Sequence, residues 1–413
     1  RSGKGLEFVV MRDGSGYCQA VVTADNVKED QFNAVSKAGL ETSIIITGNV
    51  VEDERQIGGY EIQVSEAEIV AYSEEYPIAK KEHGVDFLMD KRHLWLRSRK
   101  QWATMQVRNT IIFSMHQFFQ EQGFVQMDAP IFTGNACEGT TDLFQTDFYG
   151  DPAYLSQSGQ LYGEAMAMAM GKIYTFGPTF RAEKSKTRRH LSEFWMVEPE
   201  MAFYDLDDDM DLAEDFIKYL LSDVMEHCAE DMEFFNQRIN NTILDTLRNI
   251  TSKQFERLTY TDAISQLQKS SEKFTYPVEW GLALQAEHER YLSEKVFKKP
   301  IIVFNYPEQI KSFYMKLNED GETVRAMDVL LPNLGEIIGG SQREENYDVL
   351  LQRMRDKDLD PEHYWWYLDL RKFGSAPHAG FGLGFERLVQ FVTGMENIRD
   401  VIPFPRTPKQ AKF

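Results

Sequence analysis

The irregular succession of predicted strands and helices is the feature that most restricts the fold of this 413-residue chain. A helical period over residues 99–122 is followed by segments that lack the regular alternation of a parallel α/β sheet. Residues 205–232 predict a helix, whereas 301–305, 315–317 and 328–331 predict short strands. We therefore expect an α+β fold, with a central antiparallel sheet flanked by helices, over residues 99–413.

The first 72 residues predict a separate small β domain. Four apolar or alternating segments are separated by glycine-containing turns, at residues 8–10, 18–22, 44–46 and 62–64. Short strands with such turns are typical of a small barrel, and a helix at 25–39 suits the OB type. Because the chain enters a strand-like segment at once, we expect a barrel over 1–72 that lacks its first strand. The charged, aperiodic residues 73–98 predict a linker.

Charge and cysteine content limit the classes of function. The net charge of −20 argues against nonspecific coating of nucleic acid, although a local basic footprint for RNA stays compatible with it. No apolar run reaches the roughly 18 residues that a membrane span needs. Cys18, Cys137 and Cys228 lie far apart, which predicts a reducing compartment, the cytoplasm, and no zinc site.

A glycine-rich segment near the C-terminus is a candidate for phosphate contact. Residues 380–384 read Gly-Phe-Gly-Leu-Gly, and Arg387 follows shortly after. The spacing does not fit the dinucleotide-binding fingerprint, and no Walker A loop is present. Glycine lets a backbone approach a phosphate closely, and arginine is the preferred side chain for polyphosphate oxygens.

A second cluster combines arginine, acids and an aromatic residue. Arg181 and Glu183 precede a basic stretch at 184–190, after which Phe194 lies in a strand-like segment. Arg181 suits a phosphate, and Phe194 suits stacking on a base, although a single phenylalanine is more often a core residue. A third cluster contains Asp328 and Glu336, two acids suited to magnesium on a triphosphate.

Taken in order, these segments resemble the three motifs of class II aminoacyl-tRNA synthetases, at 118–131, 180–200 and 380–387. A barrel placed before the catalytic domain matches the aspartyl, asparaginyl and lysyl subgroup. Four segments look like those of the asparaginyl enzymes, at 156–162, 193–200, 335–344 and 396–408. The resemblance implies a cytoplasmic homodimer that adenylates asparagine with ATP and loads it onto tRNA(Asn).

The resemblance also implies the residues of the ATP site. They are Arg181, Glu183, Arg189, His190, Leu191, Phe194, Glu336, Gly384 and Arg387. Arg181 would bind the α-phosphate, while Phe194 and Arg387 would lie on opposite faces of the adenine. Arg181, Glu183 and Arg387 are the implied catalytic residues. Mg²⁺ would be held by Glu336 with help from Asp328.

The implied asparagine site consists of Glu138, Ser158, Gln160, Glu198 and Arg343. Glu198 would accept a hydrogen bond from the side-chain amide, and Arg343 would donate to its oxygen. Aspartyl enzymes carry a lysine where Gly163 stands in this chain, so a partner for a side-chain carboxylate is missing. Gly163 also fits a simpler interpretation as a helix-packing glycine, and both interpretations can hold together.

Three alternatives remain open at this stage. The first is an aspartyl-tRNA synthetase, which Gly163 disfavours. The second is a relative that makes asparagine without tRNA, which the barrel disfavours. The third is a non-catalytic tRNA-binding paralogue, which the presence of Arg181, Glu336 and Arg387 disfavours.

Overall fold

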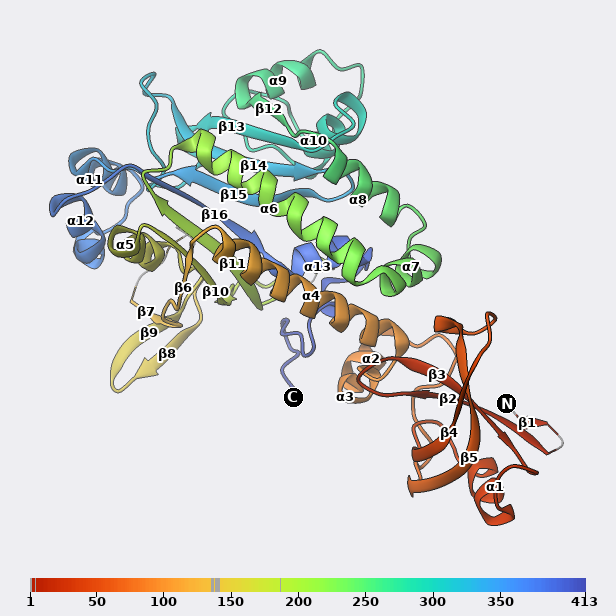
Figure 1. The fold of residues 1–413 in the computed structure, drawn as a ribbon. Coiled ribbons are helices and arrows are strands. Elements are labelled where there is room, and N and C mark those ends of the chain that lie inside the picture. Colours follow the sequence, from red (N-terminus) through yellow and green to blue (C-terminus); the bar gives the residue numbers. More distant parts are fainter. Residues whose placement is uncertain (1, 4, 135–136, 138–141, 186) are drawn as a thin grey trace. The chain divides into compact units, whose positions relative to one another are not determined.

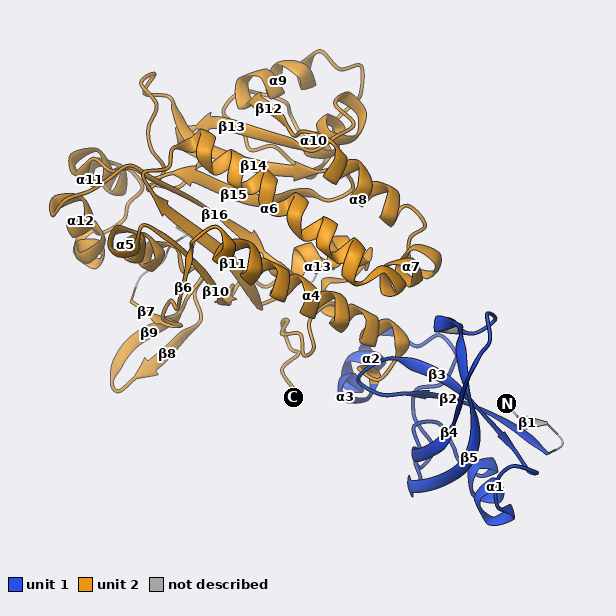
Figure 2. Cartoon of the chain, viewed as in Figure 1, with its two compact units in different colours: residues 1–94 blue, residues 95–413 orange. Residues whose placement is uncertain are grey.

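The computed structural model describes residues 2–3, 5–134, 137, 142–185 and 187–413. The chain divides into two compact units, residues 1–94 and 95–413, which are coloured separately in Figure 2. None of the helices within the described residues has the length and apolar composition that a membrane crossing requires.

The first unit is built on a five-stranded sheet in the order β1-β2-β3-β5-β4. Its elements are β1 (Ser2–Gly3), β2 (Leu6–Arg12), β3 (Tyr17–Thr23), α1 (Glu29–Ser36), β4 (Ser43–Glu52) and β5 (Tyr60–Ala71). β3 pairs with β5 in parallel, and the other neighbours are antiparallel. Ala20, Val22 and Val64 form its core with Val35 of α1. The OB-type prediction is confirmed.

Two short helices, α2 (Val85–Asp90) and α3 (Arg92–Trp95), lie in the stretch predicted to be a linker.

The second unit contains an eight-stranded sheet in the order β12-β13-β14-β15-β16-β11-β10-β6. The strands are β6 (Val125–Met127), β10 (Lys172–Phe180), β11 (Glu193–Ala202), β12 (Glu256–Thr259), β13 (Ile301–Pro307), β14 (Thr323–Leu331), β15 (Gly335–Gln342) and β16 (His378–Gly384). The pairings of β6 with β10 and of β12 with β13 are parallel, and the five pairings between them are antiparallel. This confirms the expected antiparallel sheet.

Helices flank this sheet, and α4 (Arg99–Glu121) and α6 (Leu206–His227) run side by side along it in Figure 1. The remaining helices are α5 (Gln160–Met170), α7 (Ala229–Arg238), α8 (Ile243–Ser252), α9 (Tyr260–Gln268), α10 (Ala286–Arg290), α11 (Tyr347–Asp356), α12 (Trp365–Lys372) and α13 (Phe385–Thr393). A small sheet joins β7 (Phe132–Thr133), β9 (Asp151–Leu155) and β8 (Gln145–Phe148). The buried rings of Phe119, Tyr174 and Phe216 pack together in the core between α4, α6 and the sheet.

Two predicted elements differ from the structure. The helix predicted at 205–232 divides at Cys228, whose φ of −117° and ψ of 30° interrupt the helical backbone between α6 and α7. The apolar pattern is helical on both sides of the break, so periodicity alone does not show it. The strand predicted at 315–317 is reduced to isolated bridges, of Met315 with Arg343 and of Leu317 with Val324.

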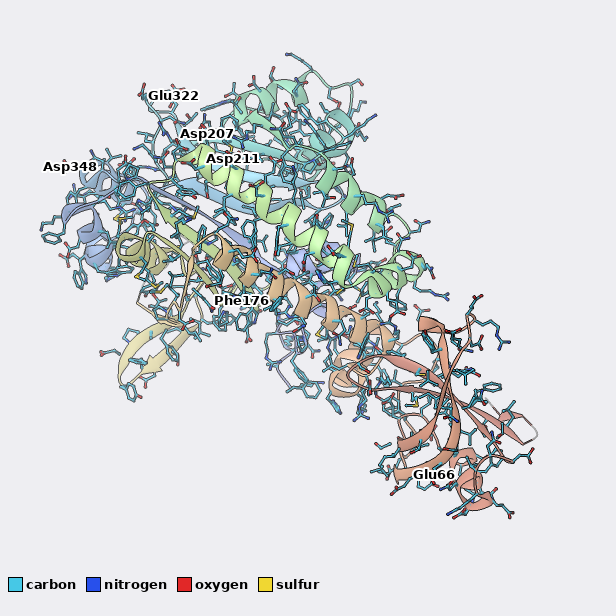
Figure 3. All side chains as sticks on the ribbon, in the orientation of Figure 1. Glu66, Phe176, Asp207, Asp211, Glu322 and Asp348 are labelled. Atoms are coloured by element: carbon cyan, nitrogen blue, oxygen red, sulfur yellow. The ribbon has the colours of Figure 1, made fainter. Side chains whose placement is uncertain are left out.

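The start of α6 shows how local sequence fixes a long helix. The Asp205 carboxylate accepts hydrogen bonds from the backbone N–H groups of Asp207 and Asp208, at 2.9 and 3.1 Å. Asp208 in turn accepts from the Asp205 N–H, which completes a capping box. Figure 3 labels Asp207 and Asp211 on this helix, where acids near the N-terminus also suit the helix dipole.

Candidate functional site

Two adjoining cavities open on the face of the large sheet opposite α4 and α6. Successive side chains of a strand point to opposite faces, and β11 follows this rule. Val197 and Met201 pack in the core, whereas Met196, Glu198 and Glu200 line a cavity of about 240 Å³. A second cavity of about 210 Å³ adjoins it. The two cavities share Arg181, Met196, Glu336 and Gly382.

The second cavity contains every residue predicted for nucleotide binding. It is lined by Arg181, Glu183, Arg189, His190, Leu191, Phe194, Glu336, Gly384 and Arg387, together with seven others. The Arg181 guanidinium lies 5.3 Å from the centre of the Phe194 ring. A phosphate-binding cation therefore lies next to a flat apolar surface, an arrangement suited to a nucleotide.

Buried contacts hold Arg387 at the edge of this cavity. Its neighbour Glu386 accepts a hydrogen bond from the Trp195 N–H at 2.8 Å and pairs with Arg108 of α4, also at 2.8 Å. These contacts connect the first turn of α13 to β11 and to α4. Burial raises the pKa of the Glu386 carboxyl, while the Arg108 guanidinium opposes that shift.

The first cavity contains the predicted amino-acid-binding residues that the structure describes. Ser158, Gln160, Glu198 and Arg343 all line it, whereas Glu138 lies outside the described residues. The Glu198 carboxylate accepts hydrogen bonds from the Ser158 hydroxyl and from the Gly159 N–H, the latter at 2.8 Å. Its position is thus fixed by the turn that precedes α5.

Arg343 forms a buried ion pair with Glu200, which the sequence did not predict. Arg343 Nε lies 3.2 Å from Glu200 Oε2, Arg343 Nη2 lies 2.5 Å from Oε1, and Arg343 Nη1 donates to Ser341 Oγ. A signal for Glu200 existed in the sequence, because it follows Glu198 by two positions and so shares its face of the strand. The pair leaves Arg343 at the wall of the first cavity.

Gly163 lies directly against this ion pair. A Cβ added at Gly163 would be 3.1 Å from Glu200 Cγ and 3.5 Å from Ile173 Cδ1. Close packing of α5 on β11 therefore requires a small residue here, which supports the packing interpretation. A lysine at this position would have to displace Glu200. Gly163 therefore fits both interpretations, since it permits close packing and it provides no cation for a substrate carboxylate.

Asp328 and Glu336 face the same small volume between β14 and β15. A Cβ added at Gly339 would be 3.4 Å from Glu336 Oε1 and 3.6 Å from Asp328 Oδ1. Lys311, which the sequence did not indicate, pairs with Asp328 at 2.8 and 2.9 Å. Burial and then the Asp328 charge raise the pKa of Glu336 to about 7, so a further cation is favoured there.

The donor set at this point fits Mg²⁺. Within the part of the chain that the structure describes, no group of three or more His, Cys, Asp or Glu side chains forms a metal cage. Mg²⁺ commonly binds through one or two carboxylates and takes its other ligands from water and substrate phosphates. Two carboxylates beside a nucleotide-type cavity meet that requirement.

Comparisons with known proteins find similar sequences and structures over almost the whole chain. Residues 84–408 match the family described as tRNA synthetases class II (D, K and N), and residues 1–70 match the OB-fold nucleic acid binding domain. Asparagine–tRNA ligases of Microcystis aeruginosa and a Nostoc species are 51% and 53% identical, over 100% of this chain and 94% of each relative. A crystal structure of Pyrococcus horikoshii asparaginyl-tRNA synthetase complexed with asparaginyl-adenylate superposes with a TM-score of 0.92. It is 41% identical and covers 100% of this chain and 93% of that one.

The close approach of β16 to β11 predicts that Gly380 accepts no side chain. A Cβ there would lie 2.4 Å from the Pro199 carbonyl oxygen and 2.5 Å from Glu200 Cδ. We expect Gly380→Ala to lower the free energy of unfolding by about 1–3 kcal/mol, because the strands must separate or the Glu200–Arg343 pair must move. Thermal unfolding measures the effect.

Gly177→Ala on β10 is the matched control, because an added Cβ there meets no atom within 4 Å among the described residues. We expect its melting temperature to stay close to that of the original chain. Equal melting temperatures for the two variants would contradict the close packing at Gly380.

Proposed function

The chain belongs to the asparagine–tRNA ligase family of class II tRNA synthetases, and on this premise we propose which of its residues carry each part of the reaction. It is an ATP-dependent aminoacyl-tRNA synthetase. Asparagine and ATP form asparaginyl-adenylate and pyrophosphate, and the asparaginyl group then passes to a terminal ribose hydroxyl of tRNA(Asn). This assignment replaces the alternatives that the sequence alone left open.

The first step needs positioning and charge stabilisation more than proton transfer. The α-carboxylate of asparagine is already ionised, so one of its oxygens attacks the α-phosphorus and pyrophosphate leaves without a general base. Such a displacement requires in-line geometry and relief of charge on the phosphoryl oxygens. Arg181 would contact the α-phosphate, and its support is that it lines both cavities. In the second step, the ribose hydroxyl oxygen attacks the carbonyl carbon of the asparaginyl-adenylate. The bond from that carbon to the phosphate oxygen breaks, AMP leaves and the hydroxyl proton is released.

The second cavity is proposed as the ATP site. Phe194 and Arg387 would hold the adenine, and Arg387 would extend to the γ-phosphate. Arg189 and His190 lie in the connection between β10 and β11, from which they would close over the nucleotide. Glu183 would lie on the adenine side or contact the terminal nucleotide of the tRNA. The support for these roles is that all of these side chains line one cavity.

Glu336 and Asp328 are proposed to hold Mg²⁺ on the phosphates. Bound there, the ion would draw charge from the triphosphate. Lys311 already places a positive charge on Asp328, and Glu336 lines both cavities. The Lys311 pair shows that positive charge is stabilised beside these two carboxylates. The position of Glu336 places one of the carboxylates next to the proposed phosphate positions.

The first cavity is proposed as the asparagine site, with Glu198 and Arg343 reading the side-chain amide. Glu198 would accept from the amide NH₂ and Arg343 would donate to the amide oxygen, while Ser158, Gln160 and Glu138 hold the amino-acid end. Aspartate would place a carboxylate against Glu198. Like charges in a closed site cost several kcal/mol unless one takes a proton, so repulsion supplies the selectivity.

Amino-acid-dependent exchange of pyrophosphate into ATP tests this assignment. We expect exchange with asparagine and at least a hundredfold lower kcat/KM with aspartate. Ser158 and Gly159 donate to different oxygens of Glu198. In Glu198→Gln, the amide oxygen can still accept from the Gly159 N–H, while the NH₂ can donate one proton to the Ser158 hydroxyl oxygen and the other to an aspartate carboxylate. The ratio of aspartate to asparagine kcat/KM should then rise at least tenfold.

Glu193→Gln serves as the control, because Glu193 begins the same strand but lines neither cavity. Its selectivity should equal that of the original chain. An unchanged selectivity in Glu198→Gln would contradict the role of Glu198, whereas exchange with aspartate alone in the original chain would contradict the asparagine site.

The domain roles and cellular location are also proposals. Residues 1–72 would bind the anticodon, 73–98 would form the linker, and 99–413 would carry catalysis. Support comes from the match of residues 1–70 to an OB-fold nucleic acid binding domain. The chain has only three cysteines, Cys18, Cys137 and Cys228, which lie far apart along the sequence, and this low content suits the reducing cytoplasm.

A homodimer is proposed through α4 and β6. β6 is an outer strand of the large sheet, and Phe113 of α4 is 69% exposed although Ile111 and Met115 on the same helix are buried. Val125 of β6 and the following Ile131 and Phe132 are exposed as well, and several exposed apolar side chains together are typical of an interaction surface.

Phe113→Glu should weaken this contact, because it places a charge in an apolar interface. We expect the molar mass from light scattering at micromolar concentration to fall from twice the chain mass of 47.9 kDa towards one chain mass. Phe373→Glu replaces another exposed phenylalanine, 75% accessible, and should leave the mass unchanged. A dimeric Phe113→Glu protein would place the interface elsewhere.

A further inference from the structure

A buried carboxylate that contacts Gln160 of the first cavity accepts hydrogen bonds from four side chains. Glu164 lies on α5 with no exposed surface. It accepts from the Tyr367 hydroxyl at 2.7 and 2.8 Å, from Arg371 Nη2 at 2.6 Å and from His378 Nε2 at 2.9 Å. The fourth donor is Gln160 Nε2 at 3.1 Å. Three of these donors hold the carboxylate from α12 and β16, and the fourth belongs to the proposed asparagine site.

The charge on Glu164 is fixed by its neighbours. Burial alone would raise the pKa of its carboxyl, but Arg371, His378 and Arg343 together outweigh burial and hold the pKa below its ordinary value. The Arg371 guanidinium is itself fully buried, at 2.6 Å from Glu164. A buried guanidinium without this partner would carry a large desolvation cost, so the pair stays ionised.

An ionised carboxylate constrains the amide of Gln160. A carboxylate without a proton can only accept hydrogen bonds, whereas an amide group presents NH₂ on one side and a carbonyl oxygen on the other. The NH₂ of Gln160 must therefore face Glu164, as the 3.1 Å hydrogen bond from Gln160 Nε2 shows. The carbonyl oxygen remains for the first cavity, which Gln160 lines.

Helix geometry makes this constraint rigid. Gln160 and Glu164 are four residues apart on α5, so their side chains share one face of the helix. The Gln160 backbone N–H also donates to Ser158 Oγ at 3.1 Å, and Ser158 donates to Glu198. Gln160 and Glu198 are the two acceptors that face the cavity. The positions of both are thus fixed by contacts with Ser158, in the turn before α5.

We propose that Glu164 is a positioning residue that orients Gln160, so that the Gln160 carbonyl oxygen accepts a hydrogen bond from the ammonium group of asparagine. This inference rests on the proposed asparagine site and adds the residue that orients the Gln160 amide within it. With the amide reversed, an NH₂ group would face a substrate cation, and a charge-assisted hydrogen bond would be replaced by repulsion. Loss of such a bond corresponds to roughly a 10- to 100-fold loss of affinity.

The test is a double-mutant cycle on the full chain, read by pyrophosphate exchange. Glu164→Gln removes the charge that orients the amide, and Gln160→Met removes the amide itself. Each single variant should raise the KM for asparagine roughly 10- to 100-fold and leave the KM for ATP within about twofold. The double variant should be no worse than Gln160→Met, because nothing remains for Glu164 to orient.

A purely structural role for Glu164 gives a different pattern. The effects of the two substitutions on the KM for asparagine would then multiply, or the KM for ATP would rise in parallel, and either result overturns the inference. Asp231→Asn breaks a partly buried ion pair, with Arg99 at 2.6 Å, and neither residue lines either cavity. It should lower thermal stability while leaving both KM values unchanged.

Two further outcomes have defined meanings. If Glu164→Gln does not fold, Glu164→Gln combined with Arg371→Met removes the unpaired cation and takes its place in the cycle. Wild-type protein without asparagine-dependent exchange would overturn the proposed function itself. Wild-type exchange with an unchanged asparagine KM in Glu164→Gln would overturn this inference alone.

Discussion

The buried ion pair between Glu200 and Arg343 is the contact on which the wall of the first cavity depends. The Glu200 side chain has no exposed surface and that of Arg343 is 3% exposed. Removing two such charges from water costs several kcal/mol per ion, so the pair is tolerable only with good geometry and further hydrogen bonds. Here two nitrogens of Arg343 face two oxygens of Glu200, and Ser341 accepts a third bond. The neighbouring glycines at 163 and 380 follow from this pair, because a side chain at either position would meet Glu200.

From this fixed point the strand β11 arranges the rest of the site. Phe194, Met196, Glu198 and Glu200 follow one another at every second position, so they line one face of the sheet from the nucleotide cavity to the amino-acid cavity. Arg181 follows β10 directly, and Arg387 lies in the first turn of α13, which follows β16. The two strands that neighbour β11, β10 and β16, thus position the two arginines proposed to bind phosphate. The chemistry needs a substrate carboxylate brought in line with a phosphorus atom, and one strand that spans both cavities supplies that alignment.

The sequence predicted those parts of the site that are encoded by residue type at short, fixed spacing. The acids and aromatic of β11, the Gly380–Gly384 segment with Arg387, and the basic connection after Arg181 were all found in this way, and the structure brings them together. Contacts distant along the chain were missed. The partners of Glu164 lie 203, 207 and 214 positions further on, and no local pattern indicates them. The fold class was predictable because irregular element order excludes a parallel α/β sheet. The break at Cys228 was not, since apolar periodicity continues across it.

The most direct test of this account is a crystal structure of the chain with a non-hydrolysable analogue of asparaginyl-adenylate. The account predicts the adenine against Phe194 and Arg387 in the second cavity. It predicts the side-chain amide within hydrogen-bond distance of Glu198 and Arg343 in the first, with the ammonium group on the Gln160 carbonyl oxygen. An analogue bound with its adenine in the first cavity, or with its side-chain amide away from Glu198, would contradict it.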